Sequence, residues 1–275
     1  MQGIKQKPIG YAELKERKSS GAHYTPLELA DFVAKHIHAN MPETSAPKIV
    51  LDPAVGDGEL LAAMARVNTE DTLFKGYDID MAAVEEANAR IGMFVSAQTS
   101  IEKKDFLNDV ATDSQTSLFQ GGASNDAKVD MVIANPPYIR TQVLGSTQAK
   151  ALAEKYKLTG RVDIYHAFIA KIAEVLKPGG IAGVIVSNRF MYTQGGKSIR
   201  ELILREFEIL HIWDFGDTKL FEAAVLPAVL ILKKKSTAVE QGATKFTSIY
   251  TDTQKQVDTS TSTDIFDALE KDGVV

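Results

Sequence analysis

An asparagine, two prolines and a tyrosine stand together at the end of a short apolar run, as Asn135, Pro136, Pro137 and Tyr138. The run begins at Val129, and its β-branched residues predict a buried parallel strand. The prolines end ladder pairing and keep the backbone extended. The Asn135 side-chain oxygen and the Pro136 carbonyl could then accept both hydrogens of an amino group, with Tyr138 stacked on its ring. The pattern predicts a grip on a planar group with an exocyclic amine; the alternative is a plain proline-rich turn.

A glycine-rich turn lies earlier in the chain, between an apolar run that ends at Asp52 and a helix predicted from Glu59. Ligands of open α/β sheets bind outside such strand ends, and Gly56 and Gly58 permit unusual backbone angles there. The third glycine of a dinucleotide fingerprint is missing, and acidic Asp52 and Asp57 would repel a pyrophosphate. The turn therefore favours a ligand with a cationic or ammonium centre.

Two further acidic positions follow predicted strands. Asp78 comes 20 residues after Gly58, where a ribose hydroxyl is usually held. Asp105 could accept a hydrogen bond from an adenine amine, and Phe106 could cover the ring; the alternative for this pair is an ordinary surface position.

The segment Tyr24-Thr25-Pro26-Leu27-Glu28 predicts a helix start. Thr25 with Glu28 three residues later is a capping box, and Pro26 occupies the first helical position. The helix is expected to run to about Asn40, and its N-terminus could receive a carboxylate.

The rest of the chain alternates between strand and helix patterns, which predicts an α/β fold with a largely parallel sheet and helices on both faces. Helices are expected at 81–90, 163–176 and 199–207. Strands are expected at 48–52, 73–77, near 93–100, from 129, and at 181–187, 209–213 and 225–232.

The composition suits one large domain. The 275 residues are 44% hydrophobic, and no apolar run is long enough for a membrane span. There is no cysteine, which fits a cytoplasmic location, and the five histidines lack metal-ligand spacing, so no metal is expected.

The net charge of −5 argues against nucleic-acid binding when taken alone, but the distribution is uneven. The segment after Tyr138 is basic and could contact a DNA backbone, unless it is simply a solvated face. The candidates are Arg140, Lys150, Lys155, Lys157, Arg161 and, farther on, Lys197.

In this order, the motifs resemble those of the amino-methylating DNA methyltransferases, closest to the γ class that methylates adenine N6, over residues 20–235. The resemblance implies a Rossmann-like methyltransferase fold with a seven-stranded sheet containing one antiparallel strand. It also implies S-adenosylmethionine as cofactor, held by Tyr24, Thr25, Pro26, Asp52, Pro53, Ala54, Gly56, Gly58, Asp78, Ile79, Asp105, Phe106 and Asn135. The catalytic motif would be Asn135, Pro136, Pro137 and Tyr138, with Phe221 as a second aromatic against the flipped base.

The resemblance implies modification of double-stranded DNA in a restriction-modification system. We expect residues 1–20 to be a polar extension, 21–235 the catalytic domain, and 236–275 a linker or the start of a recognition domain missing from this chain. Such a domain, or a specificity subunit, would then be a partner. Alternatives are methylation of a protein glutamine amide or of an RNA base amine, and a non-catalytic cofactor- or DNA-binding subunit; a nicotinamide dehydrogenase fits least.

Overall fold

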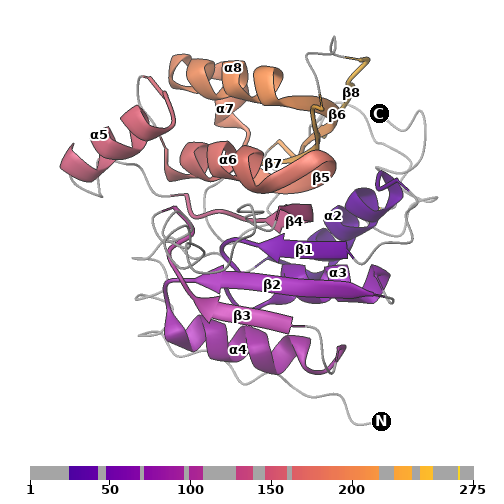
Figure 1. Cartoon of the computed structure of the whole chain (residues 1–275). Helices are drawn as coiled ribbons and strands as arrows, with labels where there is room; N and C mark the ends of the chain where they lie inside the picture. The colour runs from indigo at the N-terminus through magenta and orange to yellow at the C-terminus, as the bar shows by residue number, and fades with distance from the viewer. Residues whose placement is uncertain are drawn as a thin grey trace, which may run out of the picture.

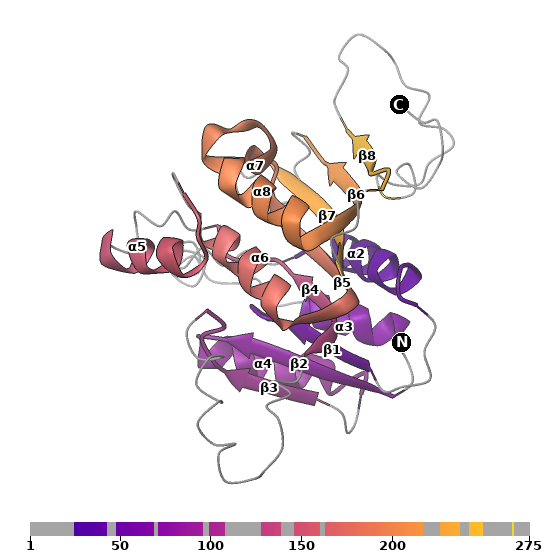
Figure 2. The ribbon, with the colours of Figure 1, turned by 45° about the horizontal axis from the view of Figure 1, so that its top comes forward.

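The computed structural model describes residues 25–42, 48–68, 71–95, 99–107, 128–138, 146–159, 163–216, 226–236, 242–249 and 266. Within these ranges, one sheet runs through the molecule in the strand order β3-β2-β1-β4-β5-β7-β6-β8 (Figure 1). Helices cover both of its faces, which gives three layers (Figure 2).

The strands confirm the predicted α/β, Rossmann-like fold. All run parallel except β7, which is antiparallel to both β5 and β6. An eighth strand, β8, pairs with the outer edge of β6 and comes from the segment expected to be a linker or the start of a recognition domain. The strands are β1 (Lys48–Asp52), β2 (Thr72–Asp78), β3 (Thr99–Lys103), β4 (Val129–Ala134), β5 (Leu176–Ser187), β6 (Phe207–Asp214), β7 (Pro227–Lys234) and β8 (Lys245–Ser248).

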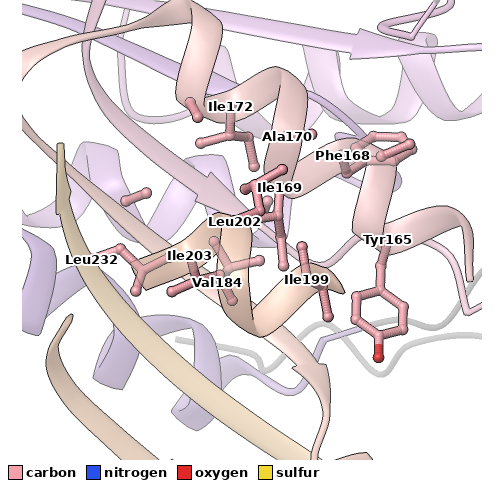
Figure 3. Packing of buried hydrophobic residues seen from close by; sticks show 14 of the residues in the cluster. Tyr165, Phe168, Ile169, Ala170, Ile172, Val184, Ile199, Leu202, Ile203 and Leu232 are labelled. Atoms are coloured by element: carbon pink, nitrogen blue, oxygen red, sulfur yellow. The ribbon is translucent and has the colours of Figure 1, made fainter. Parts of the chain in front are cut away.

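Two apolar clusters hold the layers together. One face of the sheet packs against α2 (Leu27–Ala39), α3 (Glu59–Val67) and α4 (Met81–Ile91). The other face packs against α5 (Ser146–Lys155), α6 (Ile164–Val175) and α8 (Lys197–Glu206). Figure 3 shows the second cluster, where Ile169 and Ile172 of α6 and Leu202 of α8 gather over Val184 of β5. Among the described residues, no helix has the length and apolar character needed to cross a membrane.

Two predicted boundaries were wrong. The third strand was expected near 93–100 but begins at Thr99, because α4 ends at Ile91 and exposed Met93 and Phe94 lie in the turn that follows. The helix α6 was expected to stop at a proline-glycine turn after Leu176. Instead, β5 begins at Leu176 and carries this sequence within the strand, with an irregular register against β4 between Val129 and Met131.

The parallel strands bring polar residues to one edge of the sheet. Because β1 to β6 point the same way, their carboxyl ends share that edge. Every one of these six strands ends in, or is soon followed by, an aspartate or asparagine. These residues are Asp52, Asp78, Asp105, Asn135, Asn188 and Asp214.

Candidate active site

The glycine turn and the Asn135 motif lie at neighbouring strand ends. Val50 of β1 pairs with Met131 of β4, and Leu51 with Val132, so the residues that follow the two strands emerge side by side. Ligands of open α/β sheets bind outside strand ends of this kind. The structure therefore brings together two predicted motifs that are 77 residues apart in the chain, counting from Gly58 to Asn135.

Asp52 is fully buried at the end of β1. Its Oδ1 accepts a hydrogen bond from the Ala54 amide at 3.1 Å, but its Oδ2 has no hydrogen-bond partner in the part of the chain that the structure describes. Burial raises its pKa from 3.8 to about 8, against the Ala54 bond, and the carboxylates of Asp78 and Asp57 raise it further. A buried carboxyl group with an unpaired oxygen is costly, and a nearby cation would stabilise its charged form.

The two glycines of the turn have different structural tasks. Gly56 has φ +52° and Gly58 φ +83°, both in the left-handed region that favours glycine. A Cβ on Gly56 would meet only the Ala54 carbonyl, at 4.0 Å, so space lies open above this residue. A Cβ on Gly58 would lie 2.8 Å from the Cα of Ala87, because α3 and α4 approach closely there. Gly56 therefore leaves room for a ligand, whereas Gly58 makes room for a helix.

Asp78 fastens the glycine turn to β2. Its Oδ2 accepts from the Gly56 amide at 3.0 Å, and its Oδ1 accepts from the Asp80 amide at 2.9 Å. The Val55 amide also donates to the Tyr77 carbonyl, at 2.8 Å. Ile79, the next residue, is 69% exposed and presents an apolar surface beside this carboxylate. Asp78 therefore holds the turn in place through both carboxylate oxygens, and its contact with a ribose stays a prediction.

The two residues predicted to bind adenine differ in burial, since one is half-buried and the other lies in the core. Asp105 is half-buried, and its Oδ1 accepts from the Leu107 amide at 2.9 Å. Phe106 is only 2% exposed, with ring centroids 6.5 Å from Tyr77 and 5.5 Å from Phe168. Its main contacts are therefore with the core, and contact with an adenine ring stays a prediction.

The Asn135 amide is held from both sides. Its Nδ2 donates to the Thr25 hydroxyl at 3.1 Å, and its Oδ1 accepts from the Tyr138 hydroxyl at 2.8 Å. The expected capping box at Thr25 was wrong: the helix N-cap is Pro26, which has no side-chain cap bond. The Thr25 hydroxyl reaches across to β4 instead. Two segments 110 residues apart thus fix which way the Asn135 oxygen points.

Tyr138 lies half-buried beside this amide. Its ring meets Tyr165 of α6 nearly edge-on, at a centroid distance of 6.4 Å and an angle of 63°. Burial raises the pKa of Tyr138, so its phenol stays protonated and donates to Asn135. In this conformation the ring packs against the protein, and stacking on a base stays a prediction.

The remaining predicted site residues differ in how far the structure places them. Pro53, Ala54, Pro136 and Pro137 lie at the strand ends described above. Lys155 donates to the Leu107 carbonyl at 2.7 Å, and exposed Lys197 lies 3.9 Å from Glu201. Lys150 lies on α5, and its side chain is outside the described part of the structure. Tyr24, Arg140, Arg161 and Phe221 lie outside the described residues.

Sequence reasoning missed two polar networks. Arg90 of α4 pairs with Asp57 at 3.1 Å and also with Glu59, so the glycine turn is tied to α4. At the same edge of the sheet, buried Asp214 accepts from Asn188 at 2.9 Å and from Tyr192 at 2.8 Å, which links β6 to the end of β5. A polar residue directly after an apolar strand was the available signal for Asp214.

These residues fit S-adenosylmethionine by their chemistry. Open space above Gly56, the unpaired oxygen of Asp52 and the nearby carboxylate of Asp78 suit a ligand with ribose hydroxyls and a positive centre. No group of three or more histidines, cysteines or carboxylates in the described ranges is arranged to hold a metal ion.

The strand order and this edge define a class I methyltransferase fold. A structure described as a class I S-adenosylmethionine-dependent methyltransferase from Listeria monocytogenes superimposes with a TM-score of 0.67, at 19% identity over 86% of this chain and 69% of that one. The type IIG restriction endonuclease BpuSI superimposes with a TM-score of 0.62, at 20% identity, over 82% of this chain and 27% of that one.

The chain belongs to the Eco57I restriction-modification methylase family, whose model matches residues 71–221. The Type II methyltransferase M.BanIII of Aneurinibacillus aneurinilyticus is 40% identical over 248 residues, which is 86% of this chain and 43% of that protein. M.BstVI of Geobacillus stearothermophilus is 24% identical over 237 residues, 78% of this chain and 42% of that protein. The chain thus spans less than half the length of these relatives.

Proposed function

We propose that this chain is the catalytic part of a DNA methyltransferase of a restriction-modification system, which methylates adenine N6 with S-adenosylmethionine. The observation that carries the proposal is the Asn135 amide, oriented by Thr25 at a strand end beside the glycine turn. Membership in the restriction-modification methylase family supports DNA as the substrate. The motif Asn135 to Tyr138 supports an amino group as the acceptor.

S-adenosylmethionine supplies, when bound, a methyl group on a positively charged sulfur. We assign its ribose to Asp78 and Ile79, its positive centre to the region of Asp52, and its adenine to Asp105 and Phe106. The N-terminus of α2 offers backbone amides and partial positive charge for its carboxylate. The acidic turn thus serves to stabilise a cation, which a pyrophosphate-binding turn would not do.

The protein's own contribution is to position a poor nucleophile. The lone pair of an adenine amine is delocalised into the ring, and the base must first leave the duplex, which costs a few kcal/mol. Hydrogen bonds from the amine to Asn135 Oδ1 and the Pro136 carbonyl direct the lone pair out of the ring plane. In the free chain Tyr138 donates to that Oδ1, so the arriving amine replaces one donor by another. Positioning and directed dipoles then supply most of the rate.

Labelling with tritiated S-adenosylmethionine tests the proposal. The chain is incubated separately with duplex DNA, RNA and a cell protein extract, and labelled DNA is digested to nucleosides. We expect the label in DNA, as N6-methyl-2′-deoxyadenosine. Label in protein glutamine or in RNA alone would replace this proposal by one of the other amine methylations. A recognition domain or specificity subunit would act as partner, and adding it should raise DNA labelling.

Thr25→Val is expected to lower turnover about tenfold, because the lost hydrogen bond frees the Asn135 amide to rotate and misdirect its oxygen. Thr25→Ser keeps the hydroxyl and is the matched control, with activity near that of the wild type. Single-turnover labelling of DNA gives the rate, and calorimetry gives cofactor affinity. Equal rates for the valine and serine variants would show that Thr25 does not position Asn135.

Asp52→Asn is expected to remove a pH dependence. The folded-state pKa of Asp52 is about 8 and its ordinary value is 3.8, so between these values the folded chain keeps a proton that the unfolded chain releases. The free energy of unfolding should therefore fall as pH rises from about 4 to about 8. The asparagine variant should lose this part of the slope in urea titrations at several pH values.

Cofactor binding should show the opposite slope for the same residue. A cation favours the charged carboxylate, so affinity should rise as pH increases up to about 8 and level off above it, with a total gain of about tenfold for each unit by which the cofactor lowers the Asp52 pKa. Calorimetric titrations between about pH 6.5 and 9 measure the cofactor affinity across the range in which Asp52 titrates. If Asp52→Asn retained the full slope, another group would have to be responsible.

A further inference from the structure

A groove on the α6 face of the protein contains none of the residues assigned to the cofactor or to the target amine, although two of the predicted DNA-backbone contacts, Lys155 and Lys157, line it. Its volume is about 440 Å³, within the range of about 300–1,000 Å³ that small-molecule sites occupy. Its lining includes the small residues Ala170 and Ala173 of α6 and the apolar side chain of Leu202 of α8. Lys128, just before β4, and Lys234, at the end of antiparallel β7, lie toward the edge of the sheet opposite the Asn135 motif.

The groove is positively charged on a protein whose net charge is −5. Five basic side chains line it together with only two carboxylates, Glu174 and Glu206. Both carboxylates already have basic partners: Glu206 bonds to Lys234 at 2.7 Å and to Arg205 at 2.8 Å, and Glu174 bonds to Lys171 at 3.0 Å. The charges of these acids are thus offset, partly by a lysine that does not line the groove.

Two other lysines supply charge that no described carboxylate offsets by an ion pair. Lys128 and Lys157 make no ion pair or hydrogen bond through their ammonium groups with the described residues. Lys155, by contrast, donates to the Leu107 carbonyl at 2.7 Å. Lys157 also has a φ of +53°, in the position after α5 where glycine is usual. A lysine there costs conformational free energy.

The hydroxyl of Tyr156 is the second, independent observation. Tyr156 lines the groove and is 5% exposed, yet its buried hydroxyl has no hydrogen-bond partner among the described residues. Burial, with the charges of Glu174 and Asp105, raises the pKa of Tyr156, so the hydroxyl remains a donor. A buried donor without an acceptor is rare and calls for an oxygen atom in this place.

We propose that this groove binds a phosphate group. An anion with several acceptor oxygens matches two ammonium groups and one hydroxyl that come from three positions of the chain, and charge-assisted hydrogen bonds of this kind are strong. The phosphate is either free, as inorganic phosphate, or part of a nucleic-acid backbone. The site does not depend on the methyl-transfer proposal, since none of its residues takes part in that chemistry.

Calorimetric titration at low ionic strength tests the site, with sodium phosphate in one arm and a short DNA duplex in the other. Tyr156→Phe removes only the hydroxyl and should weaken binding about tenfold. Lys157→Gly should weaken binding several-fold and also raise the Tm by about 2 °C, because glycine relieves the left-handed backbone. Lys233→Gln, on the exposed side of the same strand as Lys234, is the control for net charge and should bind like the wild type.

Each outcome of these titrations either supports or refutes the phosphate site. Loss of sodium phosphate binding in the Tyr156 and Lys157 variants supports a site for free phosphate, and loss confined to the duplex supports a backbone phosphate. If the variants bind both ligands as tightly as the wild type does, or if the wild type binds neither, the proposal is wrong. The higher Tm of Lys157→Gly excludes misfolding as the reason for lost binding.

Discussion

Asn135→Ala is expected to lower the rate of methyl transfer by roughly 10²–10³-fold, the usual cost of losing one preorganised polar group at a reacting centre. The variant lacks the oxygen that accepts from the target amine, and the Thr25 and Tyr138 hydroxyls lose their shared partner. The other residues assigned to the cofactor remain in place, so its affinity should be largely unchanged. Single-turnover labelling of duplex DNA measures the rate, and calorimetry measures cofactor binding.

Tyr138→Ala is the comparison for this experiment. It removes a ring that could stack on the base, but it leaves both acceptors, so its effect should be smaller, of the order of the 1–3 kcal/mol that base stacking contributes. If Asn135→Ala turned over as fast as the wild type, the role assigned to the amide would be refuted. If it lost cofactor binding as well, Asn135 would belong to the cofactor site rather than to the amine.

The positions of the strand ends could be predicted because each depends on local sequence. A β-branched run followed by prolines or glycines fixes where β1 and β4 stop, and parallel pairing then brings Asp52 and Asn135 to one edge. The helix α5 was not predicted, since it is rich in polar residues; among its described side chains, Leu152 and Ala153 pack on the core. The alignment of strand ends by parallel pairing was therefore more predictable than a helix whose sequence is mostly polar.

The hydrogen-bond partners in the site could not be predicted in the same way. Thr25 has the spacing of a helix cap, but its hydroxyl instead accepts a hydrogen bond from the Asn135 amide, 110 residues away. The pairing of Asp57 with Arg90, 33 residues on, likewise depends on how α4 folds back against the glycine turn. Where a side chain has two possible hydrogen-bond partners, the tertiary structure determines which one it binds. Sequence spacing indicates only the partner that is near in the chain.

Gly58 combines both kinds of information, and its substitution should have the largest effect on stability. Sequence predicts a glycine needed for a left-handed turn, and the structure adds a helix packed directly beneath it. Gly58→Ala places a Cβ 2.8 Å from the Cα of Ala87, where only backbone movement of α3 or α4 can make room. Strain at φ +83° and overpacking together should cost about 3 kcal/mol of the free energy of unfolding.

Gly56→Ala is the matched control, because it has the left-handed backbone without the crowding. Its φ is +52°, and its Cβ would meet nothing closer than a carbonyl oxygen at 4.0 Å, so we expect a cost of only about 1 kcal/mol. Urea denaturation of the two variants without cofactor compares them directly. Equal losses would mean that backbone strain accounts for both and that the contact between α3 and α4 yields at little cost. A clearly larger loss for Gly58→Ala would show that this contact fixes the turn on which the cofactor site is built.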